Sequence, residues 1–484
     1  MIEFLVFIGL PLLLAVFCYF MQDMIVQFGL TLLAAFSHIC LSALVFFGFY
    51  EANLPVFFGL DALSKLFLLI LSNVYFWVTL VSYSYLKKPV MPKAEEGKKF
   101  YFMLLNFYLA SNSAAILSSH FGMYWVAAEA TTLSVAPLIY FYRNEEALEA
   151  MWKYLFLVSV GIAFAFIGIL LLTLSAEGTP LEGRQLFFAD FVKNAGVLNP
   201  IWLKASFIFI FVGLSTKIGI APMHSGDVDA TSNAPAPIAA LMSGSLRITA
   251  LLGVMRILQI ISGTSCYEFA RVILITGALL SIFAAFVSMF RINNYKRMLA
   301  YSSVEHLGII TLGLGVGGLA FAGALFHAVY NSIAKVVLFL TAGNIHRRYK
   351  SRQVDHVKSA LTSMPKTSWL FMLAFLAISG IPPFGIFFSE LKIFEGMLFS
   401  DVPALLVLLM FFLLFIFINM GRIIFSMLYK KGSDEPALPE PERWESNHAV
   451  AIILLIILTA IAVFSPDVLY QNIIDITKDF GIRL

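Results

Sequence analysis

Apolar runs of about twenty residues follow one another along the 484-residue chain, with polar segments between them. Each run is long enough to cross roughly 30 Å of hydrocarbon as a helix. The strands of a membrane β-barrel would instead alternate apolar and polar residues. Because backbone groups in lipid must be hydrogen-bonded within their own segment, the pattern predicts an all-α, polytopic membrane protein. About fourteen transmembrane helices are expected, over residues 2–20, 27–50, 58–86, 100–118, 120–142, 150–175, 203–223, 234–261, 269–290, 298–316, 318–345, 367–398, 402–429 and 449–471.

Basic residues in the loops predict the orientation of these helices. When the loops are assigned alternately to the two sides of the membrane, one side receives 18 Lys and Arg residues. The other side receives five, namely Arg184, Lys193, Arg271, Lys478 and Arg483. Because basic loops stay in the cytoplasm, we expect both termini to lie outside, with the chain in the inner (cytoplasmic) membrane of the cell.

Two of the apolar runs contain helix-breaking residues. The seventh run has Pro222 in STKIGIAPMHSG, and the twelfth reads AISGIPPFGIFFSELK. Interrupted helices in corresponding places indicate inverted repeats with a site near the membrane midplane, although two kinked helices would give the same pattern. The predicted divisions are an N-terminal three-helix segment (1–98), two inverted five-helix repeats (99–262 and 263–430), and a loop with the last helix (431–484).

Composition excludes several classes of function. The chain is 60% hydrophobic and 13% charged, whereas soluble domains have about 25% charged residues. It has no Lys/Arg-rich patch of the nucleic-acid-binding type. Its cysteines, Cys18, Cys40 and Cys266, are isolated, so neither a disulfide framework nor an iron–sulfur or other metal site is expected. Without a dinucleotide or phosphate-binding motif, we expect no cofactor and no redox centre in this chain.

Ionisable residues nevertheless stand inside the apolar runs. Each such residue costs roughly 2.5–3.5 kcal/mol on insertion scales, so it faces the protein interior and is usually paired or functional. The candidate site residues for proton transfer are Glu129, Lys217, Arg247, His306, His327, Lys335 and Glu390. For any one of these residues alone, a structural ion pair or a satisfied polar group is the simpler interpretation, but the whole set favours a proton path.

One group of polar residues is regularly spaced. In FHAVYNSIAKVVLFL, His327, Asn331 and Lys335 recur every four residues and so share one helical face over about 12 Å. Histidine titrates near neutral pH, and a lysine withdrawn from water releases its proton more readily. This spacing therefore predicts a proton relay. By contrast, Asp61 and Lys65 are expected to neutralise each other as an i,i+4 pair with a structural role.

With these motifs, the chain resembles the antiporter-like membrane subunits of respiratory complex I, Mrp-type cation/proton antiporters and energy-converting hydrogenases. The resemblance covers roughly residues 60–430 and rests on TKIGIAPMH, NAPAPIAALMSG, RMLAYSSVEHLG, FHAVYNSIAKVVLFLTAGNI and GIPPFGIFFSELKIFEG. The segments WVAAEATTL and NEEALEAMWKYLFLVSVGIAFAFIGILLL are most similar to component F of hydrogenase-4-type complexes.

The resemblance implies a role for each candidate. Glu129 matches the fifth-helix glutamate and Lys217 the seventh-helix lysine that pairs with it. The resemblance also implies roles in proton relay for His306 in the tenth helix, His327 and Lys335 in the eleventh helix, and Glu390 in the broken twelfth helix. Arg247 departs from the pattern, because relatives have a lysine at or beside this position and arginine does not readily release a proton. It is expected either to support conduction by stabilising water or an anion, or to block it.

These features predict a proton-translocating, non-catalytic subunit of a redox-driven complex of the hydrogenase-4, formate hydrogenlyase or complex I type. Expected partners are homologous membrane subunits, a hydrogenase-like peripheral arm and the lipid bilayer. A cation/proton antiporter subunit of the Mrp kind is an alternative. So are a proton-conducting subunit paired with a soluble protein, as in inorganic-carbon uptake, and a structural subunit that no longer conducts.

Overall fold

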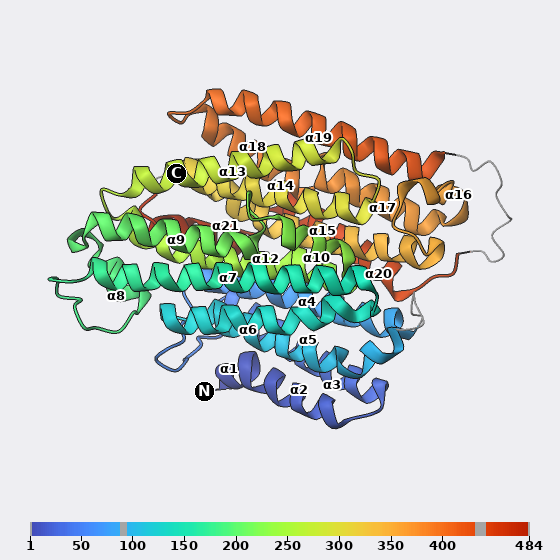
Figure 1. Cartoon of the computed structure of the whole chain (residues 1–484), viewed down its shortest axis with the longest axis horizontal. Coiled ribbons are helices and arrows are strands. Elements are labelled where there is room, and N and C mark those ends of the chain that lie inside the picture. The colour runs from blue at the N-terminus through green and yellow to red at the C-terminus, as the bar shows by residue number, and fades with distance from the viewer. Residues whose placement is uncertain (1, 88–93, 431–441, 483–484) are drawn as a thin grey trace.

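The apolar runs fold into long helices that lie side by side in one bundle (Figure 1). The structure is a computed structural model, and it describes residues 2–87, 94–430 and 442–482. Within these ranges there is no strand, and the only β-type pairings are three isolated bridges, such as that between Phe58 and Ser118. The predicted all-α fold is confirmed.

The first half of the bundle precedes and includes the first helix break. Its helices are α1 (Ile2–Phe4), η1 (Leu5–Gly9), α2 (Leu10–Phe20), α3 (Met24–Phe46), α4 (Ala62–Lys87), α5 (Ala94–Leu117), α6 (Phe121–Ile139), η2 (Tyr140–Tyr142), α7 (Glu145–Ser175), α8 (Phe188–Lys193), η3 (Ala195–Val197), α9 (Pro200–Ile218) and α10 (Ser225–Asn233).

The second half runs from the middle of the bundle to the C-terminal helices. Its helices are α11 (Ala236–Leu241), η4 (Met242–Leu246), α12 (Arg247–Ser262), α13 (Tyr267–Met289), α14 (Tyr295–Val316), α15 (Gly318–Tyr349), η5 (Val354–His356), α16 (Ala360–Ser363), α17 (Pro365–Ile378), α18 (Gly385–Leu398), α19 (Ala404–Tyr429), α20 (Ser446–Phe464) and α21 (Asp467–Asp479).

Twelve spans among the described helices are long and apolar enough to cross a membrane, so the chain is a multi-pass membrane protein. The predicted count of fourteen is not confirmed. The fifth predicted span, α6, is not among the twelve, and the twelfth is divided into α17 and α18, of 14 residues each.

The two described ends of the chain lie toward the same end of the bundle, which also holds α8 (Figure 1). Which side of the membrane this end occupies stays a prediction. Arg483, part of the loop-charge count, and the predicted polar loop at 431–441 lie outside the described residues.

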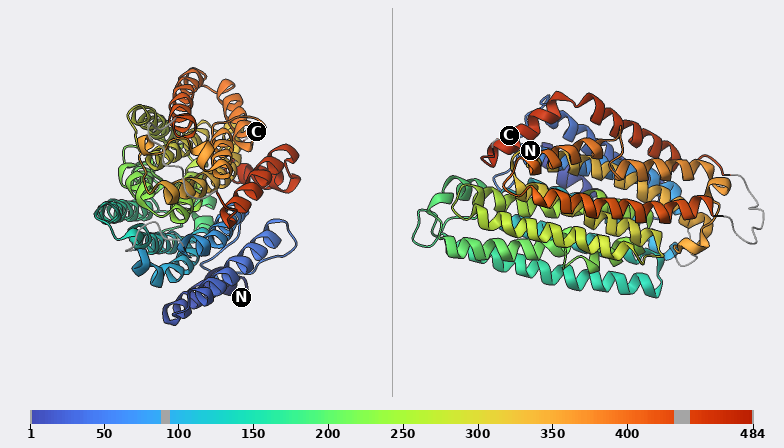
Figure 2. Two further views of the ribbon diagram at one scale, coloured as in Figure 1. Left: turned by 90° about the vertical axis from the view of Figure 1, so that its right-hand side faces the viewer. Right: turned by 90° about the horizontal axis from the view of Figure 1, so that it is seen from above.

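Three spans form the core of the bundle. The spans Ala236–Ser262, Tyr295–Val316 and Gly318–Tyr349 have their apolar windows wholly buried, whereas that of α19 is 28% buried. Seen end-on, the orange-red helix α19 lies at the edge of the bundle (Figure 2, left). Small residues bring neighbouring helices close, as at the crossing of α7 and α9. There a Cβ on Gly161 would lie 2.6 Å from the Gly213 carbonyl oxygen. Close packing of this kind fixes helix positions in a membrane.

The structure contains both predicted helix breaks. The first helix ends with α9, after which Gly219 has φ +85° and α10 begins six residues later at Ser225. The second ends with α17, followed by Gly380 with φ +67° and by α18. Each break contains a cis X–Pro peptide bond. The division of the chain into inverted repeats stays a prediction.

The predicted last span, residues 449–471, is wrong at its C-terminal end. Helix α20 stops at Phe464, because Ser465 has φ +38° and Pro466 cannot donate a helical hydrogen bond. The chain then forms the separate helix α21, which packs back on the bundle. Asn472 Nδ2 donates to the Ala62 carbonyl oxygen at 3.2 Å.

Candidate functional site

The seven predicted site residues come from six helices, three of them in the core (α12, α14 and α15) and three packed around it (α6, α9 and α18). Five of them are almost completely buried, with exposures between 0% and 3%: Lys217, Arg247, His306, His327 and Lys335. The other two, Glu129 and Glu390, are partly buried. The charges inside the apolar runs therefore face protein, as the sequence predicts.

Glu129 and Lys217 lie near each other but do not form an ion pair among the described residues. Lys217 Nζ donates instead to the Ala128 carbonyl oxygen and, at 2.8 Å, to Thr132 Oγ1. Glu129 Oε1 accepts a 3.0 Å hydrogen bond from Ser159, while its buried Oε2 has no partner. The charge of Glu129 still acts on Lys217. The pair implied by the family resemblance is thus separated in this structure.

Arg247 forms an ion pair with Asp227, a residue that sequence reasoning missed. Both side chains are completely buried, and Arg247 Nη2 also donates to Thr231 Oγ1 at 2.9 Å. Asp227 and Thr231 are four residues apart on α10, so the i,i+4 spacing of two polar residues was the available signal. Asp229, two residues further along the chain, lies on another face of α10 and pairs with Arg297 at 3.1 Å.

Several polar atoms around this ion pair have no protein partner. They include Arg247 Nε and Nη1, Asp227 Oδ1 and the hydroxyl of Tyr154, all buried. Tyr154 interacts electrostatically with Asp227 and Arg247 of this pair and with Glu129 of the first one. Buried polar groups of this kind are commonly satisfied by internal water.

Lys335 is the centre of the second group of charges. Its Nζ donates to Ser302 Oγ at 2.9 Å and to the Leu299 carbonyl oxygen at 3.5 Å. It interacts electrostatically with Glu305 on one side and with Arg247 on the other. Lys335 therefore connects the Arg247–Asp227 pair to the residues of α14 and α18.

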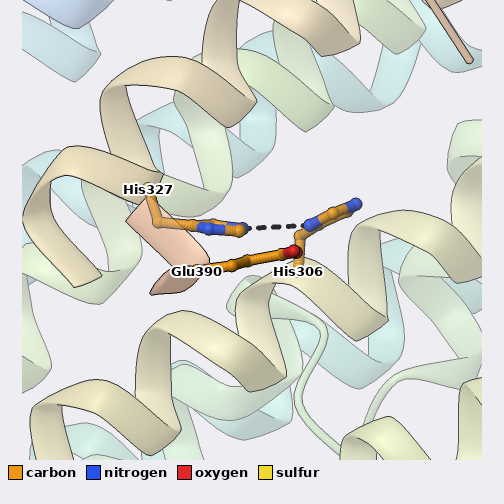
Figure 3. Close-up of side chains that lie close together, drawn as sticks. All are labelled: His306, His327 and Glu390. Atoms are coloured by element: carbon orange, nitrogen blue, oxygen red, sulfur yellow. Dashed lines mark hydrogen bonds between the residues drawn. The ribbon is translucent and has the colours of Figure 1, made fainter. Parts of the chain in front are cut away.

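Two histidines and a glutamate converge beyond Lys335 (Figure 3). His306 Nδ1 lies 3.0 Å from His327 Nε2, and His327 Nδ1 lies 3.1 Å from Ser389 Oγ. One ring nitrogen of each histidine and a Glu390 carboxylate oxygen lie within 4.8 Å of one another. Glu390 also interacts with Glu305.

Ser389 Oγ lies 2.9 Å from the Ile386 carbonyl oxygen and 3.1 Å from His327 Nδ1, and its single proton can serve only one of them. With that proton on the Ile386 carbonyl and both rings neutral, Ser389 accepts from His327 Nδ1. His327 Nε2 then carries no proton and accepts from His306 Nδ1. The result is an ordered chain of donors from α14 through α15 to α18.

The predicted Asp61–Lys65 pair is wrong. Asp61 pairs with Arg256 of α12, whose Nη2 also donates to Ser64 Oγ at 2.7 Å. Burial acts to raise the pKa of the Asp61 carboxyl, but the Arg256 charge and hydrogen bonds from Arg256 and Ser64 hold it well below its usual range. Asp61 pairs with Arg256 rather than with Lys65 because a guanidinium binds a carboxylate through two parallel hydrogen bonds.

Lys296 was counted among the loop charges, but it lies in the first turn of α14 and is 1% exposed. Its Nζ donates to the Ala234 carbonyl oxygen at 2.5 Å. A polar cavity of about 480 Å³ is lined by residues on both sides of this contact, including Asn233, Arg297 and His346. Lys296 therefore lies next to residues that line this polar cavity.

Comparisons with known proteins identify the family of the chain. Residues 118–417 match the family described as NADH:quinone oxidoreductase/Mrp antiporter, transmembrane. A hydrogenase-4 component F homolog of Methylacidiphilum infernorum is 32% identical over 353 residues, covering 72% of this chain and 74% of that protein.

Solved structures share the fold. A chain of the membrane-bound sulfane sulfur reductase, an archaeal respiratory membrane complex, superposes with a TM-score of 0.85 at 23% identity, covering 99% of this chain and 97% of that one. A chain of the Mrp complex from Dietzia sp. DQ12-45-1b gives 0.84 at 16% identity, with the same coverage. The predicted resemblance is confirmed: the chain belongs to the family of antiporter-like transmembrane subunits of NADH:quinone oxidoreductases and Mrp antiporters.

Proposed function

We propose that this chain moves protons as a membrane subunit of a redox-driven complex of the hydrogenase-4, formate hydrogenlyase or complex I type. The observation that carries the proposal is a series of electrostatically interacting side chains inside the bundle, all buried except Glu129 and Glu390, which are partly buried. The series runs through Glu129, Tyr154, Asp227, Arg247, Lys335, Glu305 and Glu390, with Lys217 beside its start. Ionisable residues inside a membrane protein mark ion pathways far more often than they stabilise it.

The coupling step is a change in the separation of Glu129 and Lys217. When the Glu129 carboxylate approaches, the protonated form of Lys217 is favoured by its counter-ion. When the two separate, as in the present structure, Lys217 keeps only neutral acceptors such as Thr132 and the Ala128 carbonyl. It then releases its proton. A redox or conformational event in partner subunits drives this change.

Protons reach the second half of the path along α14. The polar cavity is lined by Arg297, the neighbour of Lys296 in the sequence, and one helical turn beyond Lys296 the Leu299 carbonyl contacts Lys335. Ser302, Glu305 and the histidines continue the same route toward Glu390. The proton leaves near Glu390, at the second helix break.

Arg247 and Asp227 act as a fixed pair of charges rather than as proton carriers. Arginine stays protonated in proteins, so this position cannot relay a proton as a lysine would. Its charge nevertheless acts on Lys335, and Tyr154 connects it to Glu129. The pair therefore transmits a change at the first site to the second. Moving one proton across the membrane against a potential of 100 mV requires about 2.3 kcal/mol. A few electrostatic interactions between buried charges supply this energy.

The test uses the intact complex reconstituted in vesicles. Glu129→Gln and Lys217→Ala should each abolish proton translocation while the complex still assembles. The matched control is Lys204→Ala, on the same helix but outside the series, where Nζ lies over the Phe269 ring. If Glu129→Gln and Lys217→Ala both retain normal translocation coupled to turnover, the proposal is wrong.

A cation/proton antiporter subunit of the Mrp kind is the second candidate, favoured by the family match and the shared fold. Sodium-dependent transport by the complex would support it. The identity of the chains that copurify with this one distinguishes further between these candidate functions. A nickel–iron hydrogenase-like or quinone-binding subunit favours the redox-driven complex, whereas a soluble inorganic-carbon uptake protein favours a different partnership. Location in the inner membrane with both termini outside, and the absence of a cofactor in this chain, remain part of the proposal.

A further inference from the structure

We propose that His306, His327 and Glu390 also form a binding site for a divalent cation of the zinc class, and that the bound cation closes the proton path. The binding site stands on its own geometry, while its effect on transport rests on the proposed function.

The ligand set and its spacing suit zinc. Two imidazole nitrogens and one carboxylate, with water in the fourth position, form a common tetrahedral zinc site. The three ligand atoms lie within 4.8 Å of one another and come from three different helices, α14, α15 and α18 (Figure 3). The two ring nitrogens are 3.0 Å apart, and ligands of a tetrahedral zinc ion lie roughly 3.3 Å apart. The rings therefore need little movement to accept the ion.

A second layer of contacts orients these ligands. Ser389 holds His327 through Nδ1, so the unprotonated Nε2 points into the cluster. Zinc-binding histidines are usually oriented by such a hydrogen bond on their other nitrogen. On the opposite side, a Cβ on Gly380 would lie 2.3 Å from Glu390 Oε2, so only glycine leaves room for the carboxylate here.

The surrounding charges permit a divalent cation. Glu305 interacts with Glu390, so two carboxylates are available to offset the charge of the ion. The opposing group is Lys335, which acts on both histidines, donates a hydrogen bond to Ser302 and interacts electrostatically with Glu305. Because two of the three ligands are imidazoles, the site selects zinc-class ions over Mg²⁺ and Ca²⁺, which prefer oxygen.

Binding and proton transfer exclude each other at this cluster. The bound cation occupies His327 Nε2 and His306 Nδ1, the two atoms that share a proton in the structure. The His306 proton moves to Nε2 of the same ring, its other neutral tautomer. No proton donor then remains between the two rings, and the carboxylate of Glu390 is bound to the ion.

The first experiment measures binding of Zn²⁺, and of Co²⁺ as a spectroscopic probe, to the purified intact complex. We expect one site whose Co²⁺ absorption is tetrahedral. His327→Gln and Glu390→Gln should each weaken this site at least about tenfold. The matched control is His38→Gln, at a buried histidine held between Ser72 and Ser113 without a carboxylate. Equal binding by wild type, His327→Gln and Glu390→Gln would overturn the site, as would the lack of any Zn²⁺ bound to wild type.

The second experiment measures proton translocation by the wild-type complex in vesicles as Zn²⁺ is added. Inhibition over the concentration range that fills the site, reversed by a chelator, supports the proposed block. Binding at this cluster without inhibition would keep the metal site but overturn its position on the proton path. Failure of the transport proposal is thereby separated from failure of the metal site.

Discussion

The two helix breaks share a backbone arrangement but differ in the partner of the carboxylate that each one presents. At the first, Gly219 has φ +85° and a Cβ there would lie 2.8 Å from Asp227 Oδ2. At the second, Gly380 has φ +67° and is similarly close to Glu390. Asp227 forms a buried ion pair with Arg247. Glu390 forms no ion pair within the described residues and lies beside His306 and His327.

This difference gives the two helix breaks different roles. The carboxylate of Asp227 faces a guanidinium that keeps its proton, so the first break holds a fixed pair of charges. The carboxylate of Glu390 lies beside two imidazoles, each of which can accept a proton on one ring nitrogen and release one from the other, so the second break can carry protons. The same arrangement of glycine and carboxylate thus has a structural and electrostatic role at the first break and a role in proton transfer at the second.

The largest expected effect comes from Asp227→Asn, which leaves the Arg247 charge buried and unpaired. Loss of one partner of a buried ion pair costs about 3–5 kcal/mol, so the apparent melting temperature and the yield of assembled complex should fall sharply. Replacing both partners, as in Asp227→Leu with Arg247→Met, should restore much of the stability. Wild-type stability of Asp227→Asn would contradict the role assigned to this pair.

The matched substitution at the second break is Glu390→Gln. No ion pair is broken there, so we expect the melting temperature to change little. Proton translocation should nevertheless fall at least about tenfold, because the amide cannot take up and release a proton. The measurement is proton movement in vesicles at equal substrate turnover. A loss of stability as large as that of Asp227→Asn, with transport retained, would reverse the distinction between the two breaks.

Alanine at the two glycines should give smaller effects. Gly219→Ala and Gly380→Ala each force a side chain into the left-handed region, which costs about 1 kcal/mol or more. The new methyl group also displaces the carboxylate of Asp227 or Glu390. We expect Gly219→Ala mainly to lower the melting temperature, and Gly380→Ala mainly to reduce proton translocation. Ala at the exposed Gly29, which has open space around it, is the control.

The smallest expected effect concerns Glu442, which holds the start of α17 ahead of the second break. Its carboxylate accepts hydrogen bonds from the backbone N–H groups of Lys366 and Thr367 at 2.6 and 3.0 Å. Burial acts to raise the pKa of Glu442, but bonds from His448, Thr367 and Lys366 outweigh it and lower the pKa below 4.5. Its stabilisation is therefore complete above pH 4.5 and is lost as the pH falls through the lowered folded-state value.

Glu442→Gln should accordingly reduce stability at neutral pH by about 1 kcal/mol. The loss should shrink as the pH falls below 4, because the wild-type carboxyl then becomes protonated. Melting temperatures of both proteins across this pH range provide the measurement. A constant difference between them would show that the charge of Glu442 is not involved.

The features that the sequence predicts well are local ones. The prolines and glycines of the two breaks and the charges of Lys217 and Lys335 stand out against apolar neighbours, and the energetic cost of burying a charge makes each informative on its own. Family motifs then identify Glu129 and Glu390 among them.

The features that were missed depend on contacts between distant segments. Asp227 lies in a polar stretch beside Asp229, and only the direction of α10 decides which of the two meets Arg247. Arg256 reaches Asp61 across 195 residues of sequence. Lys296 has polar neighbours in NNYKR, as a loop residue would, and only the packing of α14 buries it.

The most direct test of the whole account is Lys335→Arg in the intact complex, with proton translocation measured in vesicles per substrate turned over. Arginine keeps the charge near Glu305 but does not give up its proton at the pH of the assay. The account predicts an assembled complex that no longer translocates protons through this chain. Translocation at the wild-type ratio would show that release of a proton by Lys335 is not required, and would contradict the proposed path.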